Sequence, residues 1–187
     1  SDSLFKLFSS APPVSPDLVP PFHMWIVVPS FPQARQVWNE VMQLVRPTGL
    51  IGEADKENWF FYLNGNVACK YGLVEIKSAA PQSFESLQTV GLDYLWLCEA
   101  QDITEEAWEK ILPVLRSPGR MGYAVIEGIP PLYPDHWFHK LRIIAELGQG
   151  GFFHHHGTSF QNPLLSKAQV KEIESDRYIL SEAGWRR

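Results

Sequence analysis

The sequence predicts an α/β fold with a mostly parallel sheet flanked by helices. Short apolar runs such as "MWIVV" and "YAVI" are typical of strands that are covered on both faces. Segments with apolar residues at helical spacing alternate with these runs, which is the order expected of a parallel sheet with helical connections. No internal repeat and no second domain is evident.

Composition indicates a globular chain without a general affinity for nucleic acid. The 187 residues are 45% hydrophobic, and the net charge of −5 gives no basic field, so any DNA contact would come from a local patch. Two cysteines, Cys69 and Cys98, do not make a disulfide framework, which favours a reducing compartment. No apolar run reaches membrane-spanning length, so we expect a cytoplasmic protein.

The first elements follow a proline-rich segment. Residues 10–21, "SAPPVSPDLVPP", indicate an extended lead-in, and residues 24–28 predict a buried strand. Ser30 and Gln33 have the spacing of a capping box at the start of a helix. The apolar residues of this helix recur at helical spacing: Phe31, Ala34, Val37, Val41 and Leu44. Residues 59–77 predict strands that are broken by "NGN" and "YG".

The middle of the chain predicts a loop, a strand and a helix. The loop covers residues 78–90, and the apolar run Tyr94–Leu97 follows it as a buried strand. Asp102 and Glu105 resemble another capping box, and Pro113 must kink or end the helix that they begin.

The last third continues the alternation. Residues 122–128, "GYAVIEG", predict another buried strand. Asp135 is expected to cap a helix, and "GFFHHHG" at residues 151–157 is expected to form a short strand. Ser166 and Gln169 predict the capping of a final helix.

The end of the Tyr94–Leu97 strand carries the strongest chemical signal. Hydrolytic NTPases often place Asp-Glu after such a run, the first acid for the magnesium shell and the second for the attacking water. Here Cys98 and Glu99 follow the run, so half of the acidic pair is missing.

Four segments in order resemble one protein family. "WIVVPSFPQARQVWNEV", "EIKSAAPQSFESLQTVGLDYLWLCEAQDI", "YAVIEGIPP" and "SFQNPLLSKAQVKEI" are similar to segments of the ATPase domain of the large terminase subunit, the DNA-packaging motor of tailed bacteriophages. The resemblance covers residues 22–187. It implies a P-loop NTPase core of the ASCE type for this portion of the chain.

The resemblance also implies roles, cofactors and partners. It places the catalytic acid at Glu99 and the Walker B aspartate position at Cys98. The remaining family positions are the coupling motif and a nucleotide-sensing loop: Ile129, Pro130, Ser78 and Ser86. ATP and Mg²⁺ are expected for the intact family, as are double-stranded DNA, the portal, the small terminase subunit and further copies of the subunit. The expected location is the cytoplasm of the bacterial host.

Departures from the family pattern predict that the chain alone does not hydrolyse ATP at a useful rate. No GxxxxGK[ST] loop occurs to bind the phosphates. That loop would precede residue 1, so residues 1–21 are either a proline-rich lead-in or a remnant of its helix. A neutral Cys98 thiol does not suit a hard cation, and Ile129 lacks the hydroxyl usual in the coupling motif. The fold would be incomplete at its N-terminal end, because the strand before the phosphate loop is a central one. Two strand edges would then be exposed in the middle of the sheet, unless another segment fills the gap, another copy pairs there, or the chain is a fragment of a longer protein.

Two alternatives remain open. The chain could be a degenerate, non-hydrolysing remnant that acts as a protein-binding module. It could instead be an unrelated α/β enzyme in which Cys98 is the nucleophile and His23, His136 or the triple histidine is the base. His154 and His156 could share one metal ion, but no third ligand is evident at motif spacing, so no metal site is predicted. Four basic side chains are candidates for a trans-acting finger, with a solvated surface charge favoured for each: Arg35, Lys77, Arg116 and Arg120.

Overall fold

The computed structural model describes residues 22–64, 71–88, 91–120, 122–158, 161 and 163–176. The chain divides into two compact units, which meet in sequence between Gly128 and Ile129. The first unit contains six strands and the second contains helices only, among the described residues. The first unit comprises β1 Phe22–Val28, α2 Phe31–Val45, η1 Arg46–Thr48, β2 Ile51–Asp55, β3 Phe60–Asn64, β4 Tyr71–Ser78, η2 Pro81–Leu87, β5 Tyr94–Leu97, η3 Ala100–Asp102, α3 Glu105–Ile111, η4 Val114–Arg116 and β6 Tyr123–Ile126. The second comprises α4 Trp137–Glu146 and α5 Lys167–Asp176.

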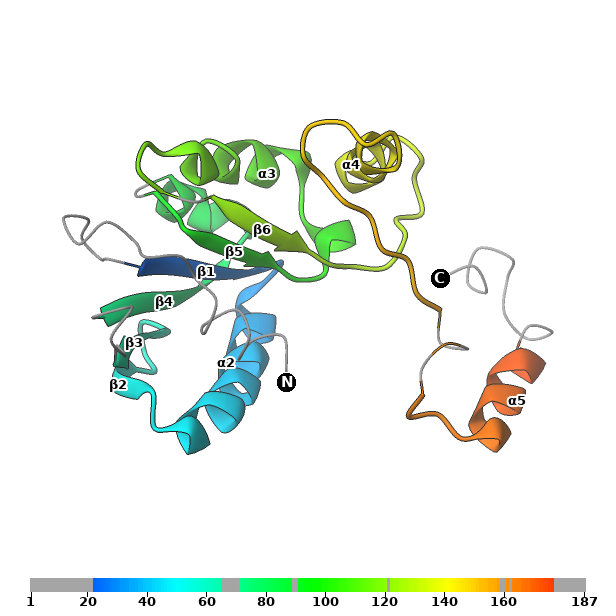
Figure 1. The fold of residues 1–187 in the computed structure, drawn as a ribbon, viewed down its shortest axis with the longest axis horizontal. Coiled ribbons are helices and arrows are strands. Elements are labelled where there is room, and N and C mark those ends of the chain that lie inside the picture. The colour runs from blue at the N-terminus through cyan, green and yellow to red at the C-terminus, as the bar shows by residue number, and fades with distance from the viewer. Residues whose placement is uncertain are drawn as a thin grey trace. The chain divides into compact units, whose positions relative to one another are not determined.

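The sheet is mixed and mostly parallel, as the sequence predicts. Its strand order is β2-β3-β4-β1-β5-β6, with β4, β1, β5 and β6 parallel to one another and β2 and β3 forming an antiparallel hairpin at one end (Figure 1). The described strands leave no unpaired edge in the middle of the sheet, so of the outcomes that the sequence left open, a segment of this chain occupies the centre. β1 lies at the centre and bonds to β4 on one side and β5 on the other, so the open edges are those of β2 and β6.

Successive side chains of a strand point to opposite faces of the sheet, so the apolar strands present apolar side chains on both faces. Helices cover both of these faces. α2 packs on one face, where Met24, Ile26 and Trp38 belong to one buried cluster. α3 and η2 lie on the other face (Figure 1). The fully buried Trp25 and Leu95 belong to that second face by the alternation along their strands.

Local details of α2 differ from the sequence-based expectation. Ser30 is the N-cap residue, but its hydroxyl donates to the Gln33 side chain at 2.6 Å instead of capping a backbone N–H group. Phe31 and Leu44 are about half exposed, since the helix buries a face centred on Trp38 and Val41. The spacing of apolar residues predicted the helix correctly, but the predicted buried face differs from the observed one by part of a turn.

The N-cap of the helix after β5 lies two residues later than predicted. Asp102 lies in η3, and Thr104 caps α3 by accepting from the Ala107 N–H group at 3.3 Å. The helix ends at Ile111, two residues before Pro113, as proline requires. Strand β2 escaped prediction because "IGEAD" has neither an apolar run nor a strict alternation.

β6 is exposed, so the prediction of a buried strand at this position is wrong. All of its residues are exposed except the half-buried Ile126, and Tyr123 and Val125 are 60% and 44% exposed. The cause is its place at the end of the sheet, where β5 is the only described strand that pairs with it. An apolar run predicts a strand of a parallel sheet, but it does not predict whether other parts of the chain bury that strand.

In the second unit, the first helix is capped by a different residue from the one predicted. His136, and not Asp135, caps α4 by accepting from the Phe138 N–H group through Nδ1 at 3.2 Å. The described residues 151–158 contain no strand, so the short strand expected there is wrong.

The capping box of Ser166 and Gln169 is confirmed at the start of α5. The Gln169 N–H group donates to the Ser166 hydroxyl at 3.3 Å, and the Ser166 N–H group donates to the side-chain oxygen Oε1 of Gln169 at 2.9 Å. Over the described part of the chain, no helix has the length and apolar character needed to cross a bilayer.

Candidate active site

The carboxyl ends of the four parallel strands form one edge of the sheet, where open α/β sheets bind their ligands. In the pairing register Val28 of β1 stands beside Ser78 of β4, and Leu97 of β5 stands beside Ile126 of β6. Cys98, Glu99 and Glu127 follow directly after these strands. Parallel pairing therefore brings Ser78, Cys98, Glu99 and Glu127 to the same edge.

Glu99 has an unusual backbone conformation. Its backbone is left-handed, with φ 52° and ψ 50°, and Trp59 is the only other described non-glycine residue with a positive φ. Such a conformation costs about 1–2 kcal/mol for a residue with a Cβ. The exposed Glu99 carboxylate accepts from the Gln101 side-chain amide at 2.6 Å, and that amide also donates to Asp102 at 3.1 Å. Backbone hydrogen bonds fix both neighbours of Glu99: the Cys98 N–H group donates to the Val27 carbonyl oxygen at 2.9 Å, and the Ala100 N–H group donates to the Glu127 carbonyl oxygen at 2.9 Å.

Cys98 is a buried and neutral side chain. It is 7% exposed, belongs to the cluster under α2, and its backbone N–H group donates to the Val27 carbonyl oxygen at 2.9 Å. Burial raises the pKa of the thiol well above its usual range, and the Glu127, Glu99 and Glu40 carboxylates raise it further. A thiol in this state does not fit the donor set of a magnesium ion, which prefers charged oxygen ligands.

The raised pKa also weighs against nucleophilic catalysis by Cys98, because the thiolate is the reactive form. The proposed base His23 lies on the other face of the sheet from Cys98 by strand alternation. It is engaged there with Glu75, whose carboxylate lies 2.6 Å from His23 Nε2. The other proposed bases, His136 and the triple histidine at 154–156, belong to the second unit.

Sequence reasoning missed Glu127. Its carboxylate helps to raise the pKa of the Cys98 thiol, and its backbone is bonded to Leu97 and Ala100 on either side of Cys98 and Glu99. The available signal was simple: "YAVI" is followed by Glu127 in the same way that "YLWL" is followed by Cys98 and Glu99. Only the strand order shows that the two runs are neighbours.

The sensing-loop residues differ in their placement. Ser78 ends β4, is 3% exposed, and its hydroxyl accepts from the Ala80 N–H group at 3.2 Å. Ser86 lies in η2 and donates to the Ser83 carbonyl oxygen at 2.7 Å. Both hydroxyls bond to nearby backbone, which is the local alternative to nucleotide contact. The coupling-motif residues Ile129 and Pro130 begin the second unit directly after Gly128.

Two of the candidate arginine-finger residues are already engaged. Arg120 is 7% exposed and pairs with the fully buried Asp93 at 2.6 Å. Lys77 pairs with Glu75 at 2.7 Å and lies over the Trp25 ring at 5.4 Å. The structure therefore gives both side chains a structural role in the first unit.

The other two candidates for the trans-acting finger, Arg35 and Arg116, are exposed. Exposure is compatible both with a finger and with the solvated surface charge that the sequence favours for each of them.

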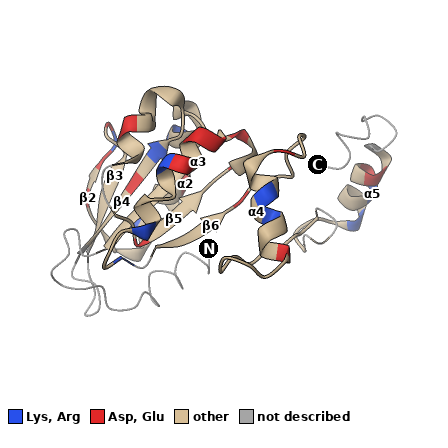
Figure 2. Ribbon diagram, turned by 90° about the horizontal axis from the view of Figure 1, so that it is seen from above, with Lys and Arg blue, Asp and Glu red and all other residues tan. Residues whose placement is uncertain are grey.

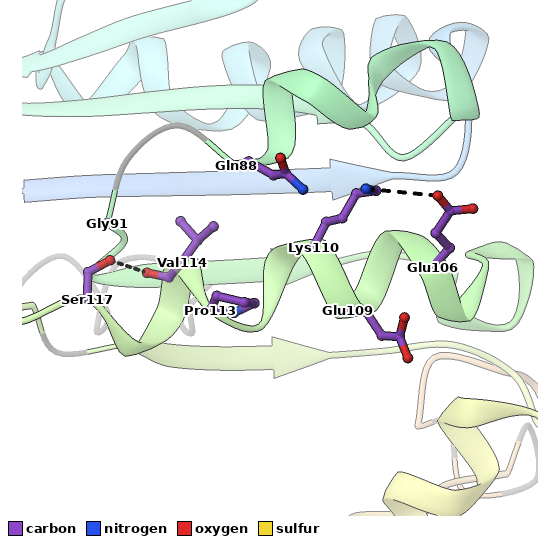
Figure 3. A pocket seen from close by; sticks show the side chains of 8 residues that line it. All are labelled: Gln88, Gly91, Glu106, Glu109, Lys110, Pro113, Val114 and Ser117. Carbon is purple, nitrogen blue, oxygen red and sulfur yellow. Dashed lines mark hydrogen bonds and ion pairs between the residues drawn. The ribbon is translucent and has the colours of Figure 1, made fainter.

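A hollow of about 460 Å³ lies on the α3 side of the sheet, separate from the predicted site residues. Figure 3 shows its lining, in which Lys110 pairs with Glu106 at 3.9 Å and Ser117 donates to the Val114 carbonyl oxygen at 3.1 Å. Some of the polar groups that line the hollow are therefore already paired with other protein groups. It contains neither a strand end nor a strained residue, so the edge around Glu99 remains the better candidate site.

The described residues contain no group of three or more His, Cys, Asp or Glu side chains arranged for a metal ion. His154 and His156 stack with ring centroids 6.3 Å apart, and Glu146 lies 3.5 Å from His154 Nδ1.

The first unit is an α/β fold with a mostly parallel sheet and helices on both faces. Its fold is that of solved ATPase domains of phage large terminases. A variant of the Thermus phage P74-26 large terminase ATPase domain superposes with a TM-score of 0.72 at 20% identity, over 99% of this chain and 78% of that one. The resemblance predicted from the sequence is confirmed at the level of the fold.

Two structures of the large terminase from a thermophilic bacteriophage show the same similarity. Its complex with ATP-γ-S has a TM-score of 0.72 at 14% identity and covers 99% of this chain. Its complex with ADP has a TM-score of 0.68 at 16% identity over 87% of this chain. The matches span 41% and 38% of that terminase. No family model and no curated protein matches the sequence.

Proposed function

We propose that this chain is part of the ATPase domain of a viral DNA-packaging motor, in which ATP hydrolysis drives DNA translocation. The observation that carries the proposal is Glu99: an exposed acid in strained backbone at the carboxyl edge of a parallel sheet whose fold matches large terminase ATPase domains. Strained residues concentrate at active sites. An acid held there by Gln101 is suited to orient and deprotonate a water molecule attacking a γ-phosphate.

The same edge suggests how hydrolysis would be transmitted. Ser78 closes β4 beside β1, and the end of β6 leads within three residues to Ile129 and Pro130 at the start of the second unit. A shift of the β6 end on loss of the γ-phosphate would reach the second unit through this short connection. Ile129 has no hydroxyl to sense the phosphate, so the response would come from backbone and packing.

We further propose that the chain alone is inactive. It has no phosphate-binding loop, and Cys98 stands where the magnesium-associated acid is expected. A bound magnesium ion supplies charge neutralisation of the phosphates, and most of the catalysis in phosphoryl transfer comes from such stabilisation and from positioning. Without these groups Glu99 would have no oriented substrate on which to act.

Contacts with DNA, the portal, the small terminase subunit and further copies of the chain belong to the same proposal. Acidic and basic residues are interspersed over the described elements, as Figure 2 shows. Together with the net charge of −5, this predicts that DNA is held by a local patch or by other parts of the motor.

The decisive experiment compares the chain with a longer protein that carries a phosphate loop, taken from in-frame sequence upstream of residue 1. ATP turnover and Mg·ATP binding by calorimetry are measured for both, with Glu99→Gln and the control Glu53→Gln, an exposed acid on β2. We expect turnover only in the longer protein, lost in Glu99→Gln and retained in Glu53→Gln. Equal rates in the two variants would remove Glu99 from catalysis.

A non-hydrolysing binding module is the second candidate, favoured by the buried neutral Cys98. It predicts no in-frame phosphate loop and no heat of Mg·ATP binding, with retained binding to portal or motor subunits. Turnover by the 187-residue chain itself, abolished by Glu99→Gln, would contradict both this candidate and the proposed inactivity.

A further inference from the structure

The face of the sheet on which α2 packs is covered at β1 and exposed at β6. In the pairing register Met24, Tyr94 and Tyr123 form one row across β1, β5 and β6, and the row lies on the α2 face. The exposed fraction rises along this row from 0% to 8% and then to 60%. The neighbouring row repeats the trend, from 1% at Ile26 in β1 to 44% at Val125 in β6. An apolar strip of β6 is therefore left uncovered beside α2.

Trp96 lies at the border of this strip. It stands on β5 between Ile26 and Val125 in the register and packs, half-buried, against the cluster under α2. Its indole N–H group is buried and has no hydrogen-bond partner among the described residues. Native proteins rarely leave such a group unpaired. This part of the face therefore lacks a neighbour that offers apolar side chains together with a hydrogen-bond acceptor.

The uncovered region has the width of one helix. Adjacent strands lie about 4.8 Å apart, so β5 and β6 together span about 10 Å, which is about the diameter of an α-helix with its side chains. On this face α2 covers β1 and β4, whereas α3 lies on the other face (Figure 1). One short amphipathic segment beside α2 would complete the layer.

Residues 3–8 of this chain, "SLFKLF", have the sequence of such a segment. Leucine and phenylalanine occupy four of these six positions, and Leu4, Leu7 and Phe8 recur at the spacing of one helix face. Lys6 is the only charged residue among the six. The segment therefore offers an apolar side to the sheet and a single positive charge.

Charge and chain length both allow this segment to reach the strip. Glu127 directly follows β6, lies on the α2 face by alternation and is exposed, so it offers a carboxylate to Lys6. Residues 9–21 contain five prolines, and 13 residues extended at about 3.1 Å each span about 40 Å. The path from the start of β1 across two strands to β6 is only about 10 Å wide, so the connection is long enough.

We propose that residues 3–8 dock on the α2 face of β5 and β6, with their apolar side chains against Trp96, Tyr123 and Val125. The contact is intramolecular, and residues 9–21 hold the segment near the face at a high effective concentration. Docking covers one face of β6, which is the environment that its apolar run predicts. The inference does not depend on the proposed nucleotide-binding function, because it uses only the exposure of the sheet and the sequence that precedes β1.

Thiol labelling of the 187-residue chain tests the proposal at position 125. Val125→Cys is made in a Cys69→Ser background, and iodoacetamide labelling of each cysteine is followed by mass spectrometry. Leu4→Ser with Phe8→Ser should speed labelling at position 125 about tenfold or more, because labelling in the unchanged segment requires it to open locally. Glu53→Cys, at an exposed position of β2, should be labelled at the same rate with and without the two serines. Equal rates at position 125 in the two backgrounds would overturn the proposal.

A photo-crosslink provides a second measurement in which the sheet itself is unaltered. The photo-crosslinking amino acid p-benzoylphenylalanine is placed at position 8 instead of Phe8, and the products are mapped by mass spectrometry. We expect crosslinks within one chain to residues 94–97 and 123–127. Crosslinks confined to other parts of the chain would overturn the proposal. Crosslinks between chains, with a doubled mass in light scattering, would also overturn it and would make a second copy the occupant of the strip.

Discussion

Stability at acid pH should depend on Glu75, which joins β4 to β1 on the face of the sheet away from α2. Its carboxylate lies 2.6 Å from His23 Nε2, accepts from the Trp25 indole at 2.8 Å and pairs with Lys77 at 2.7 Å. Burial by itself would raise the pKa of Glu75. Contacts with His23, Lys77 and Trp25 outweigh burial and hold its pKa at about 2, compared with an ordinary value of 4.5.

The magnitude and sign follow from linkage. A drop from 4.5 to about 2 corresponds to about 3.4 kcal/mol, at about 1.36 kcal/mol for each pKa unit. Since the Glu75 side chain is 20% exposed, solvent screening reduces this to about 2 kcal/mol. Because the folded-state pKa is depressed, the stabilisation is complete above pH 4.5 and is lost as the pH falls toward 2.

Urea unfolding followed by tryptophan fluorescence measures this contribution at a series of pH values. Glu75→Gln should be about 2 kcal/mol less stable than the natural chain at pH 7, and the difference should shrink steadily between pH 4.5 and pH 2. Glu53→Gln, an exposed acid on β2, should show no such trend. A difference that stays constant down to pH 2, or is absent at pH 7, would refute the role of the network.

Two further predictions concern Cys98 and a glycine. In a Cys69→Ser background, iodoacetamide at pH 8 should leave Cys98 unlabelled in the native chain and label it in urea, because burial raises the thiol pKa; rapid native labelling, read by mass spectrometry, would contradict this. Gly122 and Gly49 both have a left-handed φ, of 64° and 71°, but a Cβ at Gly122 would collide with the Leu115 carbonyl oxygen, whereas Gly49 has open space. Urea unfolding should show a loss of about 3 kcal/mol or more for Gly122→Ala and about 1 kcal/mol for Gly49→Ala, and equal losses would exclude the collision.

Most strands and helices of the first unit were predictable because their signals are local. The runs that became β1 and β5 are uninterrupted apolar segments, and α2 has a helical spacing of apolar residues. Glu99 could be singled out because it directly follows such a run. Each of these signals lies within a few residues and reflects the period of its own element.

Helix-capping residues and the exposure of strands were less predictable, because both depend on the elements that surround them in the fold. Thr104 replaces Asp102 as the cap of α3 because the chain first forms η3 at the end of β5. β6 has the same apolar pattern as β5, yet it is exposed because nothing among the described residues pairs with its outer edge. Hydrophobicity alone does not distinguish a central strand from an edge strand.

The sequence by itself determined the class of fold, the strand that precedes Cys98 and Glu99, and the absence of an acid at position 98. Only the tertiary structure decided that β1 lies at the centre of the sheet and that Glu127 stands beside Cys98. The reason is that secondary structure follows from side-chain periodicity along one segment, whereas strand order and register arise from pairing between segments far apart in the chain. The sequence shows a neutral cysteine at position 98, but only the strand pairing shows that the acid Glu127 lies beside it.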